Sequence, residues 1–250
     1  MIDPLFDFTG RVMLVTGGSR GLGYQMVKAF AERGADVIVA SRKLDNCEAV
    51  AGEVRSLGCR ALAVSAHVGK WAECDALIER AYGEFGRIDV LVNNAGMSPP
   101  CPSHEMPESL FDSVMNLNFK GPFRLASQIG HRMAQGEGGA IINISSTGAL
   151  MALPGVVPYG AAKAALNAMT VSLSREYAPK VRVNTISAGP FLTVSRTPRP
   201  HRSRRGARAT QRRRRACRRS GSRVSCRPRT AWARFPRPPR RRRSSVSTAV

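Results

Sequence analysis

The strongest constraint on the fold is a repeated alternation between short apolar segments and longer amphipathic ones. Runs rich in valine, isoleucine and leucine are followed by stretches whose apolar residues recur at helical spacing. The expected strands are 11–17, 36–41, 60–66, 88–96, 139–146 and 181–187, and the expected helices are 23–35, 44–58, 71–86, 109–135 and 159–178. Continuous apolar strands separated by helices are typical of a parallel sheet that is covered on both faces. With right-handed crossovers, the pattern predicts an α/β fold, a doubly wound parallel sheet with helices on both faces, which is Rossmann-like.

The chain changes character near residue 193. Residues 1–193 hold 18 Lys and Arg against 17 Asp and Glu, a net charge of +1. Residues 194–250 hold 21 Arg and no Lys, Asp or Glu, so this segment carries +21 of the formal +22. The segment also has no Leu, Ile, Met, Asn or Tyr, so it cannot bury enough apolar surface to offset the entropy of ordering it. We expect one folded domain at 1–193 and a disordered Arg/Pro-rich tail at 194–250.

Composition and motifs argue against several classes of protein. No apolar run approaches the ~20 residues needed to span a bilayer. The first residues, "MIDPLFDFTGR", carry Asp3 and Asp7 and no apolar run, so they do not resemble a secretory signal. The six cysteines show no paired spacing, and no CxxC or His/Cys cluster suggests a metal site. We therefore expect a cytoplasmic protein with free thiols, no membrane association and no metal.

A glycine-rich turn, "TGGSRGLG" at 16–23, joins the first expected strand to the first expected helix. Gly17 permits a tight turn, whereas Gly21 and Gly23 let backbone and helix approach closely, so that amides at the helix N-terminus face a pyrophosphate. At this position the pattern predicts a dinucleotide site, and a purely structural turn is the alternative. The residues expected to bind the cofactor here are Gly17, Ser19, Arg20, Gly21, Leu22 and Gly23.

The end of the second expected strand bears on the choice of cofactor. An acidic residue there would accept hydrogen bonds from a ribose 2′-hydroxyl, which is the NAD pattern. The sequence "ASRK", Ala40–Lys43, has no carboxylate. Arg42, joined by Arg20, can instead bind a 2′-phosphate, because a guanidinium matches a phosphate dianion. This predicts NADP(H) in preference to NAD(H); the alternative is that Arg42 and Lys43 are solvated residues that open a helix.

The segment "YGAAK" places Tyr159 and Lys163 on one face of an expected helix. A tyrosine hydroxyl is a poor base at neutral pH, but a nearby ammonium and a positively charged nicotinamide favour the phenolate. A proton-transfer group tuned in this way can accompany hydride transfer at a carbonyl carbon. Ser146 follows the fifth expected strand at the carboxyl edge of the sheet, where ligands bind in such folds. Taken alone, a Tyr-Lys pair at this spacing is more often an exposed helix face than a site.

Five motifs occur in order along the chain: "TGGSRGLG", "NNAG" at 93–96, "NFKG" at 118–121, "ISS" before Gly148, and "YGAAK". In this combination the chain resembles the short-chain dehydrogenase/reductase family over about Gly10 to Thr193. The resemblance implies an NAD(P)-dependent oxidoreductase acting on a small-molecule alcohol or carbonyl compound. It also implies a role for each member of a catalytic set: Tyr159 as general acid/base, Lys163 as its partner and ribose ligand, Ser146 orienting the substrate oxygen, and Asn118 holding a water linked to Lys163.

The same resemblance implies further contacts to the cofactor. Asn93, Ala95 and Gly96 would stabilise the sheet and contact the dinucleotide. Gly189 and Thr193 would contact the carboxamide end of the nicotinamide. Members of the family are usually dimers or tetramers, so a homo-oligomer is implied for a chain with the family's own C-terminus.

Residues 194–250 depart from the family, which continues past the position of Thr193 with a substrate-covering loop, helices and a seventh strand. The dominance of Arg, Pro, Ala, Ser, Thr and Gly is typical of GC-rich DNA read in a wrong frame. The last eight residues, "RSSVSTAV", are compatible with codons that give the family-like ending "VLRVDGG" when read two bases later. We interpret the tail as a frameshift product, which would leave the chain unstable or inactive. The alternatives are an arginine-rich arm that binds nucleic acid without sequence preference, or a nucleotide-binding domain without catalysis.

Overall fold

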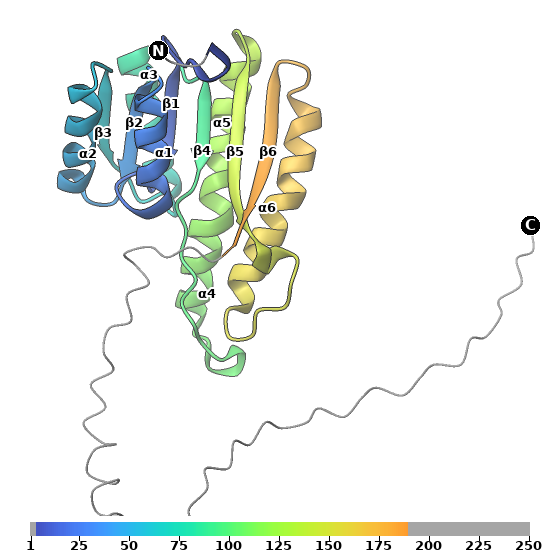
Figure 1. Cartoon of the computed structure of the whole chain (residues 1–250). Coiled ribbons are helices and arrows are strands. Elements are labelled where there is room, and N and C mark those ends of the chain that lie inside the picture. Colours follow the sequence, from blue (N-terminus) through green and yellow to red (C-terminus); the bar gives the residue numbers. More distant parts are fainter. Residues whose placement is uncertain (1–3, 190–250) are drawn as a thin grey trace, which may run out of the picture. The chain divides into compact units, whose positions relative to one another are not determined.

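The computed structural model describes residues 4–189 and confirms the predicted α/β architecture (Figure 1). Six parallel strands form one sheet in the order β3-β2-β1-β4-β5-β6. The strands are β1 Val12–Thr16, β2 Asp36–Ser41, β3 Ala61–Ser65, β4 Val90–Asn93, β5 Gly139–Ser146 and β6 Val181–Ala188. The predicted disordered tail and the predicted cofactor contact at Thr193 lie outside the described residues.

Residues 4–189 also contain six α-helices and four short helical segments. The α-helices are α1 Gly21–Ala31, α2 Leu44–Ser56, α3 Trp71–Phe85, α4 Glu108–Met115, α5 Gly121–Gln135 and α6 Val157–Glu176. The 3₁₀ turns are η1 Pro4–Phe6, η2 Ser103–Glu105 and η4 Thr147–Ala149, and η3 Asn116–Lys120 is π-helical. Among the helices of residues 4–189, none combines the length and the apolar character that crossing a membrane requires.

The helices lie in two layers, with α1 and α2 on one face of the sheet and α3, α5 and α6 on the other (Figure 1). Neighbouring residues of β1 divide between the two apolar clusters that result. Leu14 packs under α3, α5 and α6, whereas Met13 and Val15 pack under α1 and α2. Because successive side chains of a strand point to opposite faces, a strand covered on both faces must be apolar throughout. This is the physical reason for the unbroken apolar runs in the sequence.

The helix expected over 109–135 is interrupted by the π-helical segment η3. Gly121 is the point of closest packing, since a Cβ there would lie 1.8 Å from the carbonyl oxygen of Val68. The side-chain amide of Asn118 donates to the carbonyls of Val114 and Met97, each at 2.9 Å. These contacts favour a wider turn, and such π-bulges are frequent at functional sites. Sequence periodicity gave no signal for the contacts with Val68 and Met97, because these partners lie far along the chain.

Candidate active site

The glycine turn closes tightly over the carboxyl ends of β1 and β2. Gly17 and Gly21 have φ values of 66° and 58°, a conformation that favours glycine. A Cβ at Gly23 would lie 2.2 Å from the carbonyl oxygen of Gly17. The amides of Gly17 and Gly18 donate to the carbonyl of Ala40 at 2.8 and 3.3 Å. The turn is therefore a cradle that side chains would fill, and it brings the N-terminus of α1 to the sheet edge, an arrangement that fits a pyrophosphate.

Hydroxyl and guanidinium groups surround the same edge. Ser19 and Ser41 lie with their Oγ atoms 2.8 Å apart, and both side chains are half-buried. Arg20 and Arg42 are exposed, and neither forms an ion pair with any residue in 4–189. Leu22 is half-buried in the first turn of α1. The hydroxyls of Ser19 and Ser41 thus form one polar cluster at this edge of the sheet, and Arg20 and Arg42 directly follow these serines in the sequence.

Asn94 joins this cluster to the rest of the sheet, and the sequence analysis missed it. Its side-chain amide donates to the carbonyls of Thr16, at 2.8 Å, and Gly17, at 3.4 Å. The hydroxyl of Thr16 in turn accepts from the backbone N–H of Asn94 and of Ala95, at 3.0 and 3.1 Å. The sequence signal was present in "NNAG", because two adjacent amides at the end of a strand must face opposite ways.

Asn93 points to the other face and is 2% exposed. Its amide donates to Asn143 Oδ1 at 2.9 Å and to the carbonyl of Pro122 at 3.3 Å. Asn143 donates to the hydroxyl of Thr170 on α6, also at 2.9 Å. The side chain of Asn93 thus helps to tie β4 to β5 and α6, while its predicted contact with the cofactor stays a prediction.

Lys163 is the most deeply buried charged side chain of the site, at 3% exposure. Its Nζ donates to the carbonyl of Ile144 at 2.7 Å and lies 5.9 Å from the centre of the Tyr159 ring. Burial lowers the pKa of Lys163 to about 8, because desolvation disfavours the ammonium. Tyr159 itself is half-buried, one helical turn earlier on α6. The predicted Tyr-Lys pair is therefore held against the end of β5 rather than on an exposed helix face.

Asn118 and Gly96 lie beside the lysine. Asn118 is fully buried, and its Oδ1 accepts from the backbone N–H of Met97 at 3.3 Å. A Cβ at Gly96 would lie 2.8 Å from Asn118 Oδ1 and 3.8 Å from Lys163 Nζ. Gly96, Asn118 and Lys163 thus converge at the carboxyl end of β4, although they are far apart in the sequence.

Ser146 is the last residue of β5 and is 8% exposed. Its Oγ accepts from the backbone N–H of Gly148, at 3.1 Å, which caps η4. The next turn of chain packs against α6, since a Cβ at Gly160 would lie 3.0 Å from the carbonyl oxygen of Gly148. Ser146 and Tyr159 therefore come from adjoining segments at one edge of the sheet. Gly189 directly follows β6, which is the neighbour of β5.

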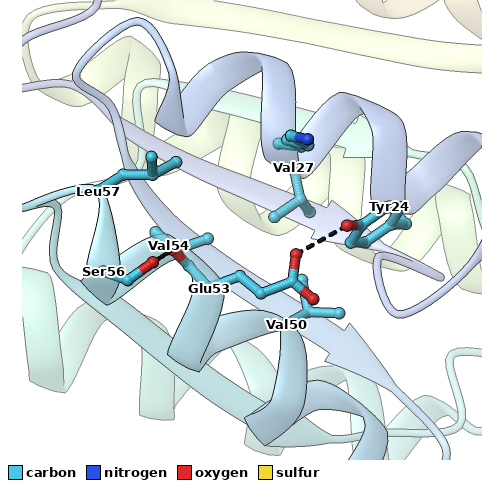
Figure 2. A pocket seen from close by; sticks show the side chains of 8 residues that line it. Tyr24, Val27, Val50, Glu53, Val54, Ser56 and Leu57 are labelled. Carbon is cyan, nitrogen blue, oxygen red and sulfur yellow. Dashed lines mark hydrogen bonds between the residues drawn. The ribbon is translucent and has the colours of Figure 1, made fainter.

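A separate cavity of about 220 Å³ lies between α1 and α2 (Figure 2). It is lined mainly by the aliphatic side chains of Val27, Val50, Val54 and Leu57. The hydroxyl of Tyr24 donates to Glu53 at 2.7 Å across it. No predicted site residue lines this cavity, and its composition suits helix packing better than chemistry.

A family model, several relatives and several solved structures are similar to this chain. The family model for short chain dehydrogenase matches residues 11–203. An uncharacterised oxidoreductase of Methylorubrum extorquens is 40% identical over 187 residues, which is 74% of each chain. An NAD-dependent glycerol dehydrogenase of Listeria innocua is 35% identical over 192 residues, 76% of this chain and 74% of the relative. The crystal structure of a short-chain type dehydrogenase/reductase from Mycobacterium marinum has a TM-score of 0.72, with 34% identity over 76% of each chain.

Proposed function

The chain belongs to the short-chain dehydrogenase/reductase family of NAD(P)-dependent oxidoreductases that act on CH–OH groups, and from this premise we propose that it interconverts a small secondary alcohol and a carbonyl compound with NADP(H). The observation that carries the proposal is the buried Lys163 ammonium beside Tyr159. Lys163 has no carboxylate partner within residues 4–189 and donates only to a backbone carbonyl there. Burying such a charge is unfavourable, and perturbed groups of this kind cluster at functional sites.

In the proposed reaction Tyr159 exchanges a proton with the substrate oxygen, and Ser146 holds that oxygen through its hydroxyl. Lys163, whose Nζ lies 5.9 Å from the centre of the Tyr159 ring, would hold the ribose of the nicotinamide. When bound, the nicotinamide supplies or accepts the hydride. Both donor hydrogens of the Asn118 side chain are committed to the carbonyls of Met97 and Val114. The Asn118 Oδ1, which accepts from the backbone N–H of Met97, has a second lone pair that would accept from the proposed water linked to Lys163.

The cofactor preference rests on the end of β2. Ala40–Lys43 carries no carboxylate, and Arg20 and Arg42 are available to a phosphate dianion beside the Ser19 and Ser41 hydroxyls. Arg42→Ala is expected to raise the Kd of NADPH by about 10-fold and leave that of NADH nearly unchanged, because only NADPH has the 2′-phosphate. Isothermal titration with both cofactors measures this.

Lys43→Ala is the matched control for Arg42→Ala. It removes the neighbouring exposed cation, which precedes α2 at its N-cap. Equal weakening of NADPH binding in both variants would mean that Arg42 acts only through its positive charge and not through a specific contact with the 2′-phosphate. Equal effects of Arg42→Ala on NADPH and NADH would contradict the proposed 2′-phosphate contact.

We propose, in addition, that residues 194–250 are a frameshift product and that the catalytic domain is 1–193 with its last quarter replaced. The family match ends at residue 203, and the aligned relatives named above match over 74% of their own length. DNA sequence over codons 185–250 tests this: an intact frame with no recoverable family ending would contradict it. If the arginine-rich segment is instead a nucleic-acid arm, the chain should be retained on a nucleic-acid column in a salt-dependent way.

The proposed chemistry is tested by Tyr159→Phe in the frame-restored chain. Phenylalanine keeps the ring and removes the hydroxyl, so kcat for carbonyl reduction should fall by about 10²–10⁴-fold while the Kd of NADPH changes little. Tyr24→Phe is the matched control, since the Tyr24 hydroxyl bonds to Glu53 between α1 and α2. Turnover by Tyr159→Phe at the unmodified rate would remove the basis of the proposal.

The frame-restored chain is also proposed to be a homo-oligomer in the cytoplasm. The family resemblance supports the first point, and free thiols at Cys47, Cys59, Cys74 and Cys101 support a reducing compartment. Light scattering of the restored and printed chains would measure the oligomeric state of each.

A further inference from the structure

A chain of hydrogen-bonding side chains runs from the core to the glycine turn. The Sγ of Cys47, in the first turn of α2, lies 3.2 Å from Ser41 Oγ. Ser41 Oγ lies 2.8 Å from Ser19 Oγ, in the turn between β1 and α1. Cys47 is 0% exposed, whereas both serines are half-buried. The series therefore starts at a fixed atom in the core and ends at the predicted ribose site.

The thiol is well placed to hold the serines in one arrangement. Its sulfur also lies 3.6 Å from the carbonyl oxygen of Val64 and 3.9 Å from that of Ser41. Two arrangements are possible. If the thiol donates to one of these carbonyls, its sulfur can accept from the Ser41 hydroxyl. If the thiol donates to Ser41 Oγ, the Ser41 hydroxyl can donate to Ser19 Oγ. In both cases the Ser41 hydroxyl is held between Cys47 and Ser19, so neither serine rotates freely.

The hydroxyls of Ser19 and Ser41 lie at the proposed site for the ribose 2′-position, which is where NADP(H) and NAD(H) differ. Ser41 ends β2, at the position where the NAD pattern has a carboxylate, and it directly precedes Arg42. Ser19 directly precedes Arg20. Hydroxyl donors add to guanidinium groups in binding a phosphate dianion, and bonds to a charged group are stronger than bonds to a ribose hydroxyl.

We propose that Cys47 is a positioning residue for cofactor choice: it orients the Ser41–Ser19 hydroxyl pair toward the 2′-phosphate of NADP(H). This role presupposes the NADP(H) preference proposed above. Cys47 touches no part of the cofactor and acts only through Ser41. Its loss should therefore weaken NADPH binding selectively, without a matching effect on NADH.

The test is the Kd of NADPH and of NADH for the full chain and its Cys47→Ala variant, by isothermal titration at raised ionic strength. Salt screens the charge of residues 194–250, which is identical in all variants. Cys47→Ala should raise the Kd of NADPH about 5-fold and that of NADH less than about 2-fold. Cys47→Ser keeps a hydrogen-bonding group and should restore most of the preference. Equal changes for the two cofactors, or none, would overturn the inference.

Cys74→Ala is a closely matched control. Cys74 is the fourth residue of α3, as Cys47 is of α2, and is likewise 0% exposed. Its thiol donates to the carbonyl of Val68 at 3.2 Å. Thermal unfolding should show similar loss of stability for both alanine variants, while only Cys47→Ala changes the ratio of the two Kd values. A ratio changed equally by both variants would mean general loosening and would contradict positioning.

A double-mutant cycle separates a relay from independent contacts. Ser41→Ala should weaken NADPH binding at least as much as Cys47→Ala, and the double variant should be no weaker than Ser41→Ala alone. Additive effects would contradict the relay. A wild-type chain with no preference for NADPH would overturn both this inference and the proposed cofactor, whereas a preference that survives Cys47→Ala overturns only the inference.

Discussion

The two halves of the sheet are covered differently. Within residues 4–189, the half formed by β1, β2 and β3 has helices on both faces (Figure 1). In the half formed by β4, β5 and β6, α5 and α6 cover one face, and on the opposite face burial decreases toward the edge, from Val92 of β4 at 0% exposure to Ile144 of β5 at 8%. On the face shared with α1 and α2, Val39 of β2 is 0% exposed, while Ile186 of β6 is 51% exposed. Ile186 is assigned to this face because its neighbour Thr185 bonds to Thr170 on α6. Within the described residues, the first half, which we call the cofactor half after its proposed role, is thus covered on both faces. The second half, which we call the catalytic half after its proposed role, has an exposed face at β6.

The polar groups of the two halves differ in their burial, and those of the cofactor half are the more exposed. Around the glycine turn they are backbone amides, half-buried hydroxyls and exposed guanidinium groups. Beside β4 and β5 they are buried: Asn118 at 0%, Lys163 at 3% and Ser146 at 8% exposure. We infer that cofactor binding in the first half depends mainly on the shape of the backbone. The proposed chemistry of the second half depends mainly on a charged group that is removed from water. The two should therefore respond to different perturbations.

Gly23→Ala should have the largest effect, because it should disrupt the glycine turn on which cofactor binding depends. Its Cβ would lie 2.2 Å from the Gly17 carbonyl oxygen, so the turn must open. We expect the Kd of NADPH to rise by about 100-fold and the free energy of unfolding to fall by about 2–3 kcal/mol, measured by titration and by urea unfolding. Gly52→Ala is the control, since a Cβ in that part of α2 meets nothing within 4 Å. Unchanged binding by Gly23→Ala would contradict the role of the turn.

Lys163→Met tests for the buried charge of the catalytic half, because it should change how the free energy of unfolding depends on pH. In the folded chain the pKa of Lys163 is about 8, against an ordinary value of 10.5. Between these values the unfolded chain binds more protons, so the free energy of unfolding of the wild type should rise with pH relative to Lys163→Met. The expected rise is about 2–3 kcal/mol from about pH 8 to about pH 10, because the burial penalty is fully present below this range.

Urea unfolding at several pH values measures this difference. Lys180→Met is the control, because the side chain of Lys180 is exposed. Its difference from the wild type should stay constant over the same range. A constant difference for Lys163→Met as well would contradict a desolvated ammonium.

A pair of core truncations should give the smallest effect and sharpen the comparison directly. Val39→Ala should lower the free energy of unfolding by about 2 kcal/mol, because it leaves a cavity under α1 and α2. Ile186→Ala removes one carbon more but should cost below about 1 kcal/mol, since half of that side chain is already exposed. Thermal or urea unfolding of both variants in parallel measures the contrast. Equal losses would show that the face of β6 is covered in solution.

Much of the fold follows from local signals in the sequence. The apolar run expected at 139–146 is β5, and the segment expected at 36–41 is β2, because a strand buried on both faces leaves an unbroken apolar run. The sequence also predicted Ser146, Tyr159 and Lys163 as a group. The structure places them on adjoining segments at one edge, since parallel strands bring their carboxyl ends together.

The remaining features depend on contacts between distant segments. The motif "NNAG" could have indicated a role for Asn94, but its partners, the carbonyls of Thr16 and Gly17, are known only once β4 and the glycine turn lie side by side. The thiol of Cys47 looked like an ordinary core residue of α2 until β2 and β3 were seen to surround it. The break in the predicted long helix requires the carbonyl of Val68 to meet Gly121. Helical periodicity contains no information about any of these partners.

The π-helical turn at Asn116–Lys120 holds about one residue more than an α-helical turn, because its hydrogen bonds run from residue i to residue i+5. Deleting one residue here would therefore leave continuous α-helix, and the apolar stripe of Leu125, Ile129 and Met133 would still face the sheet. An α-helix advances by about 100° per residue, so one deletion in the middle of α5 would instead turn the rest of that stripe toward water. We infer that a change in the number of residues between α4 and α5 alters the position of Asn118 more than it alters the packing of α5.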